Sequence, residues 1–295
     1  SGDYVSNTSG TSNLRLGVNA GNSIASGGNY NVTIGDEAGT AITTGDNNVD
    51  IGFEALKTED ANGNNVAVGY RSLKTLNAGA EGYTTAVGLD SGTSLTTGVR
   101  NTIMGAFAGD ALTDADYNVA IGYAALTGDT KGSQSTAVGY EALLSQNFST
   151  STDSLNTAVG YRTGTAVTTG QYNTLVGGLA GDALTDADLN VAVGQNALTV
   201  DTLGSKSTAI GAAALNVQNF TTATDSHNTA VGYSAGSAVT TGVSNTLIGS
   251  LAGDHITAGI RNQCFGYSAG TSLTESDRNV AIGTFALGAD TLGSK

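Results

Sequence analysis

The feature that most constrains this fold is a short pattern, close to Asn-x-x-aliphatic-Gly, which marks sixteen units at a nearly constant spacing. The closing glycines are Gly17, Gly35, Gly52, Gly69, Gly88, Gly105, Gly122, Gly139, Gly160, Gly177, Gly194, Gly211, Gly232, Gly249, Gly266 and Gly283. The usual period, about 17 residues, is too short for helical-pair repeats, which need about 33 to 47 residues. It suits one coil of a β-solenoid with two short strands and two turns. We therefore predict an all-β chain, a parallel β-solenoid or β-roll of about sixteen coils.

The coils are grouped into a longer repeat. The longest steps run from Gly139 to Gly160 and from Gly211 to Gly232, and residues 116–147 match residues 188–219 at an offset of 72. Four coils, with steps of 17, 17, 17 and 21 along the chain, therefore form one higher-order repeat of 72. We expect residues 1–12 to be a lead-in and residues 13–295 to form a single continuous solenoid, which is part of a longer array or filament.

Equivalent positions, counted from the closing glycine as position 0, form regular columns. Position −1 is apolar in all sixteen units, and position −4 is Asn in thirteen. Stacked Asn residues form hydrogen-bonded ladders along stacked strands. Position +4 is Gly or Leu. Every unit with Gly at +4 carries an aliphatic residue at +7, whereas the units with Leu at +4 carry a polar residue there, except for Leu76. A close-packed interior conserves volume, so we predict one aliphatic core residue per coil, from either position.

Composition removes several function classes. The net charge is −14 and the few Lys and Arg residues are scattered, whereas nucleic-acid binders carry a basic stripe, so we expect no nucleic-acid partner. No run of 18 apolar residues exists, and we expect no membrane insertion. The two histidines, His227 and His255, occupy different columns, and no Ser/His/Asp grouping repeats. We therefore do not predict an enzyme.

Three stretches of the chain carry a family resemblance. NTAVGYRTG (156–164), NVAIGYAAL (118–126) and STAVGYEAL (135–143) resemble the head repeats of trimeric autotransporter adhesins (YadA-like) and related phage tail-fibre repeats. The resemblance implies a left-handed parallel β-roll, three chains side by side, and a role in surface attachment at a cell surface or on a virion. The coils here are longer than those of the family, and no heptad stalk or membrane anchor is visible.

Together these observations predict a non-enzymatic, extracellular or virion-surface fibre segment that serves as a rigid spacer and attachment surface. The expected partner is a further copy of the chain, in a homotrimer. One alternative is a self-assembling filament subunit that stacks head to tail. Another is an ice-binding solenoid, although the eight Thr residues at position −3 are interrupted by Val.

The acidic motif GDALTDAD, at 109–116 and 181–188, is a candidate calcium site. Its possible ligands are Asp110, Asp114, Asp116, Asp182, Asp186 and Asp188. A third copy, GDHITAGI at 253–260, keeps the aliphatic fourth residue but loses the two later aspartates. The aliphatic residue is thus the part that the fold requires, and calcium is the single cofactor that the sequence suggests.

Two further features are candidates for contact with a receptor or glycan. The long coils carry loops 145–154 and 217–226, each with an Asn-x-Ser/Thr sequon, and the candidate residues are Asn147, Phe148, Asn219 and Phe220. Loops held by a rigid scaffold often carry function. Tyrosine also follows the closing glycine in six coils, at Tyr70, Tyr123, Tyr140, Tyr161, Tyr233 and Tyr267. Such tyrosines suit either sugar binding or contacts between chains, and we favour the second.

Overall fold

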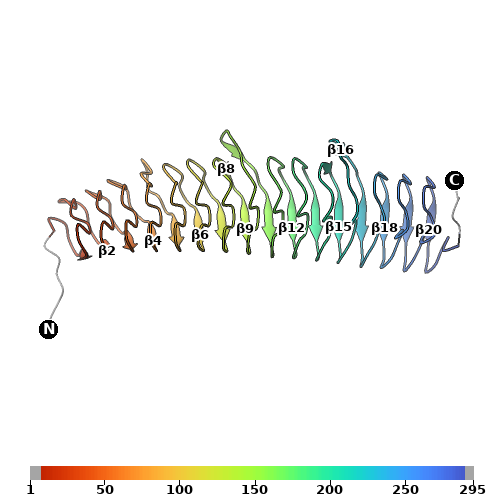
Figure 1. The fold of residues 1–295 in the computed structure, drawn as a ribbon, viewed down its shortest axis with the longest axis horizontal. Coiled ribbons are helices and arrows are strands. Elements are labelled where there is room, and N and C mark those ends of the chain that lie inside the picture. The colour runs from red at the N-terminus through yellow and green to blue at the C-terminus, as the bar shows by residue number, and fades with distance from the viewer. Residues whose placement is uncertain (1–7, 290–295) are drawn as a thin grey trace. The chain divides into compact units, whose positions relative to one another are not determined.

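A computed structural model describes residues 8–289, and within this range it is all-β with no helix. The chain divides into two compact units, which are described separately. The first extends to Glu141 and includes Asn147–Asp153, and the second contains Ala142–Gln146 and continues from Ser154. In each unit the coils follow one another in chain order, and each contributes one arrow on the same side (Figure 1). The predicted lead-in, residues 1–12, lies largely outside the described residues.

The main strands are three residues long and pair in parallel with the strands of neighbouring coils. In the first unit they are β1 (Leu14–Leu16), β2 (Val32–Ile34), β3 (Val49–Ile51), β4 (Val66–Val68), β5 (Thr85–Val87), β6 (Thr102–Met104), β7 (Val119–Ile121) and β9 (Thr136–Val138). In the second they are β11 (Thr157–Val159), β12 (Thr174–Val176), β13 (Val191–Val193), β15 (Thr208–Ile210), β17 (Thr229–Val231), β18 (Thr246–Ile248), β19 (Gln263–Phe265) and β20 (Val280–Ile282). These sixteen parallel strands, one for each predicted coil, confirm the predicted β-solenoid.

The second strand expected in every coil forms only in the long coils and the coils before them. β8 (Gly132–Ser133) pairs with β10 (Thr152–Asp153), and β14 (Gly204–Ser205) pairs with β16 (Thr224–Asp225). In the other coils among residues 8–289 the return path consists of turns and bends. These turns rely on left-handed backbone at positions −5, +2 and +4, where extended strand cannot continue.

The closing glycine is required because the backbones of consecutive coils touch at this column. Gly122 has a φ of 135°, and a Cβ built on it would lie 2.3 Å from the carbonyl oxygen of Gly139 in the next coil. Side chains essentially never occupy such a position. The glycine column therefore sets how closely the coils stack.

The aliphatic core residues are placed as predicted. Leu126 at position +4 and Leu112 at position +7 are both fully buried. Position +4 is left-handed in both kinds of coil, with a φ of 57° at Leu126 and 50° at Gly109. A left-handed Leu costs about 1–2 kcal/mol. Burying its side chain contributes about 1.5–3 kcal/mol, which offsets that cost and explains why Leu is accepted there.

The Asn column forms the expected ladder, and most of its bonds join a side chain to the backbone. The backbone N–H of Asn48 donates to Asn31 Oδ1 at 2.9 Å. The Nδ2 of Asn31 donates to the carbonyl oxygen of Gly45 at 2.8 Å. Most of the buried Asn residues thus satisfy two backbone groups of the next coil, while Asn65 satisfies one through its Oδ1 and has an unpartnered Nδ2. Buried backbone groups need such partners where little regular strand is present.

Candidate functional site

The main strands carry apolar side chains on the side that faces away from the core, and we call this surface the strand face. It consists of positions −3 and −1 of each coil, which point outward because residues of a strand alternate between its two faces. In β7, for example, Ala120 is fully buried while Val119 and Ile121 are half-buried. No outward-facing apolar column was predicted from the sequence, although the alternation of residues along each strand indicates one.

Every residue at position −1 of the strand face is apolar and at least partly exposed. They are Leu16, Ile34, Ile51, Val68, Val87, Met104, Ile121, Val138, Val159, Val176, Val193, Ile210, Val231, Ile248, Phe265 and Ile282. Even within the stacks, Met104 is 41 % and Ile210 is 38 % exposed. Monomeric proteins rarely expose continuous apolar surface of this kind, so each unit presents a candidate interaction surface.

Aromatic side chains extend the strand face on both sides, at positions −5 and +1. Tyr117 and Tyr123 flank β7 and are 52 % and 47 % exposed. The rings of Tyr123 and Tyr140 stack with centroids 5.3 Å apart, and those of Phe53 and Tyr70 stack at 5.4 Å. A ring that stacks on its neighbour has one face covered, whereas a sugar platform needs free ring faces. This packing favours contacts between chains for these tyrosines.

The first GDALTDAD copy sends its three aspartates to different partners. Asp110 accepts a hydrogen bond from the hydroxyl of Thr127 in the next coil. Asp114 faces Lys131 at 3.6 Å, and Asp116 Oδ1 accepts the N–H of Val99 at 2.7 Å. Burial raises the pKa of Asp110 above its ordinary value, while the Thr127 bond acts in the opposite direction.

The second copy repeats the first and third of these contacts and differs at the middle aspartate, which pairs with a hydroxyl in place of a lysine. Asp182 accepts the hydroxyl of Thr199 at 2.5 Å, Asp186 that of Thr169 at 2.6 Å, and Asp188 the N–H of Gln171 at 2.8 Å. Within residues 8–289 the structure brings together no group of three or more His, Cys, Asp or Glu side chains that could hold a metal ion. Calcium binding at these six aspartates stays a prediction, and the observed role of the acids is to link coils.

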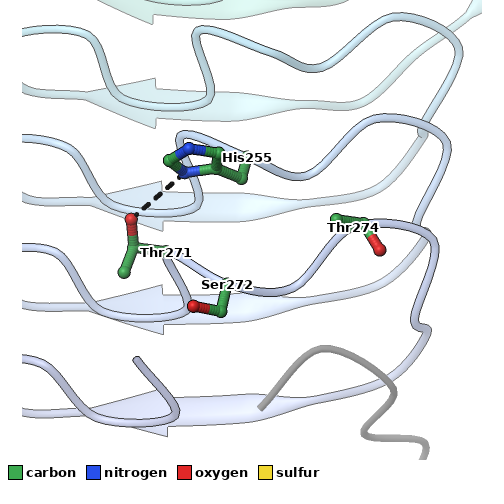
Figure 2. A pocket seen from close by; sticks show the side chains of 4 residues that line it. All are labelled: His255, Thr271, Ser272 and Thr274. Carbon is green, nitrogen blue, oxygen red and sulfur yellow. Dashed lines mark hydrogen bonds between the residues drawn. The ribbon is translucent and has the colours of Figure 1, made fainter. Parts of the chain in front are cut away.

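The third copy forms a shallow depression near the end of the second unit. His255, Thr271, Ser272 and Thr274 line this space of about 290 Å³ (Figure 2). His255 Nδ1 lies 3.3 Å from Thr271 Oγ1 and 3.2 Å from Asp254 Oδ1. A catalytic relay needs the hydroxyl and the carboxylate on opposite ring nitrogens, and here both contact the same one. His227 lies on another coil at position −5 and is exposed.

The single cysteine is equally unsuited to catalysis. Cys264 is fully buried at position −2 of β19. Burial raises the pKa of its thiol to about 11, so the nucleophilic thiolate is scarce at neutral pH.

The two long loops are built on buried acids at position +7, where the sequence pattern indicates only a polar residue. Asp129 Oδ1 accepts the N–H of Gly132 at 2.9 Å and that of Phe148 at 3.2 Å. Asp201 does the same for Gly204 and Phe220, both at 3.0 Å. The base of each loop is therefore held by a buried acid of the preceding coil.

The Phe and Asn residues predicted to contact a receptor differ in their exposure. Phe148 and Phe220 are 5 % and 6 % exposed, so they anchor the loops and are not accessible to a receptor. Asn147 is exposed and Asn219 is half-buried, and each accepts a hydroxyl hydrogen bond, from Thr130 and Thr202 respectively. The hydroxyl-rich tips, residues 149–153 and 221–225, are the accessible part.

No protein-family model matches this chain, and comparison with curated proteins finds no relative. The described residues include no helix long and apolar enough to cross a membrane.

Proposed function

We propose that this chain is a non-enzymatic fibre segment, a stiff spacer whose strand face binds further copies of itself. The supporting observation is the unbroken apolar column at position −1 of both units. Covering one half-exposed Val or Ile contributes about 1 kcal/mol. A face that repeats this contribution in every coil favours association along its length.

A homotrimer is the arrangement we favour, in agreement with the resemblance to adhesin and tail-fibre repeats. Three chains with their strand faces turned inward leave the loops 145–154 and 217–226 outside, since each loop rises from the upper edge of its coil while the main strand lies in the lower part (Figure 1). These loops are then the proposed attachment surface for a receptor or glycan, outside the cell or on a virion.

The decisive experiment combines light scattering with charge placed on the strand face. The double variant Val176→Lys and Val193→Lys puts two ammonium groups on adjacent strands, β12 and β13, at paired positions. The control Thr222→Lys and Ala223→Lys adds the same charge to the exposed tip of a loop. We expect the first variant to dissociate and the control to keep the wild-type mass. Equal masses for wild type, variant and control would contradict the proposal.

Ice binding is a second candidate, because the eight Thr residues at position −3 lie outward on the strand face. Thr208, Thr229 and Thr246 occupy consecutive strands in paired register. A thermal-hysteresis assay distinguishes the two: a clear positive from a monomeric sample would replace the fibre proposal.

A further inference from the structure

One ionisable side chain lies in the core at a position where most of the following coils carry small apolar residues, whereas the two preceding coils carry Arg15 and Thr33. The Nε of Arg15 donates to the carbonyl oxygen of Ala20. Asp50 occupies position −2, the inward position of β3. In the following coils of the first unit this column contains Ala67, Ala86, Ile103, Ala120 and Ala137. The fold therefore does not require an acid at this position.

The Asp50 carboxyl has no partner. Its side chain is fully buried, and neither Oδ1 nor Oδ2 has a hydrogen-bond partner. The paired residues across the sheet are Thr33 and Ala67. The hydroxyl of Thr33 is directed to the carbonyl oxygen of Leu14, at 3.3 Å. Within residues 8–289 Asp50 forms no ion pair, since the ion pairs of this region join other residues.

The surrounding space is too small for a compensating ion. A Cβ built on Gly39 would lie 2.7 Å from Asp50 Oδ2 and 2.8 Å from Thr33 Cγ2. Calcium needs about six to eight oxygen ligands at roughly 2.3–2.6 Å, which this packing does not provide. A bare carboxylate without a cation is costly in such a place, so the neutral acid is the form that fits.

The charged group that acts on Asp50 is Glu59, which is also fully buried at position +7 of the same coil. Glu59 Oε2 accepts the N–H of Ala78 at 3.1 Å, and Oε1 accepts that of Asn62 at 3.3 Å. Both oxygens bind these backbone groups, and neither is hydrogen-bonded to Asp50. Burial raises the pKa of Asp50 well above its ordinary value, and the proximity of Glu59 acts in the same direction.

We propose that Asp50 is a proton-operated switch in the core of the first unit: the coils of β2, β3 and β4 close around the neutral acid and loosen when it ionises. The closed coils bind the proton more tightly than the opened ones, because an opened Asp50 is hydrated. Opening therefore increases as pH rises from the ordinary Asp pKa towards the raised one. The opening equilibrium grows by at most about tenfold per pH unit in that window.

Hydrogen–deuterium exchange of the full chain tests this switch at pH 5 and pH 8, after correction for intrinsic exchange. The reporting peptides cover residues 31–69, and peptides covering residues 229–253 of the second unit, which contain no Asp or Glu, serve as an internal control. The variants are Asp50→Asn, which keeps the shape but cannot ionise, and Asp50→Ala, which installs the residue found in most neighbouring coils. If one variant fails to fold, the other carries the comparison.

For the wild type, we expect protection of residues 31–69 to fall by tenfold or more between pH 5 and pH 8. In both variants protection should be independent of pH and higher than wild type at pH 8, and residues 229–253 should not change in any protein. Equal wild-type protection at the two pH values would overturn the proposal. An equal fall in Asp50→Asn would also overturn it, because a group other than Asp50 would then be titrating.

Discussion

Replacing Gly122 by Ala probes the close stacking of coils on which the fold depends. Two costs add at this site. The φ of 135° is a conformation that L residues rarely adopt, and the new Cβ would lie 2.3 Å from the Gly139 carbonyl oxygen. Relieving that contact requires neighbouring coils to move apart. This movement weakens their hydrogen bonds, in which Gly122 N–H donates to Met104 and Gly139 N–H donates to Ile121, each at 2.7 Å. Backbone strain of about 1–3 kcal/mol and a weakened ladder bond of about 1 kcal/mol give a loss of about 2–4 kcal/mol.

Gly79→Ala is the matched control, because it separates the two costs. Gly79 has a φ of 65°, and a Cβ on it would meet nothing within 4 Å. Its loss should therefore be torsional alone, about 1–2 kcal/mol. Urea unfolding followed by circular dichroism measures both variants against wild type, at equal slope of the transition. If Gly122→Ala costs no more than Gly79→Ala, the coils do not touch at the glycine column and the reasoning fails.

Three further predictions concern other parts of the coils. Asn245→Ala removes the acceptor for the Asn262 N–H and the donor to the Gly259 carbonyl, and urea unfolding should show a loss of about 2–4 kcal/mol; an unchanged midpoint would show that the ladder is dispensable. Phe220→Ala should cost about 3–5 kcal/mol and speed proteolysis within residues 217–226, whereas the exposed Thr222→Ala should do neither. Calcium should leave the melting temperature unchanged, because Asp110, Asp116, Asp182, Asp186 and Asp188 already accept hydrogen bonds; a rise on titration would establish the calcium sites.

The period and the columns were sufficient to predict the solenoid, because coil stacking imposes one repeating geometry on sixteen units. The sequence also predicted that the aliphatic core residue stands at either +4 or +7, and Leu126 and Leu112 are buried accordingly. The expectation of two strands per coil was wrong for most coils. Left-handed residues such as Leu126 interrupt the return path, and no composition rule places Leu in that conformation.

The candidate sites were harder to predict, because they depend on contacts between coils. The acids of GDALTDAD resemble a ligand cluster in the sequence. In the structure, however, they accept hydrogen bonds from Thr127 and Val99, which lie on the coils to either side. Phe148 looks exposed because it lies in a loop, but Asp129 of the preceding coil holds its backbone and the ring is buried. The strand face was missed because an apolar column is normally assigned to a core.

The mass of the wild-type chain in solution tests the central claim most directly. Multi-angle light scattering on an eluting sample should give about three times the 29.2 kDa of one chain, independent of dilution in the micromolar range. A monodisperse mass of one chain would contradict the account, because the strand face would then be stable in water without a partner.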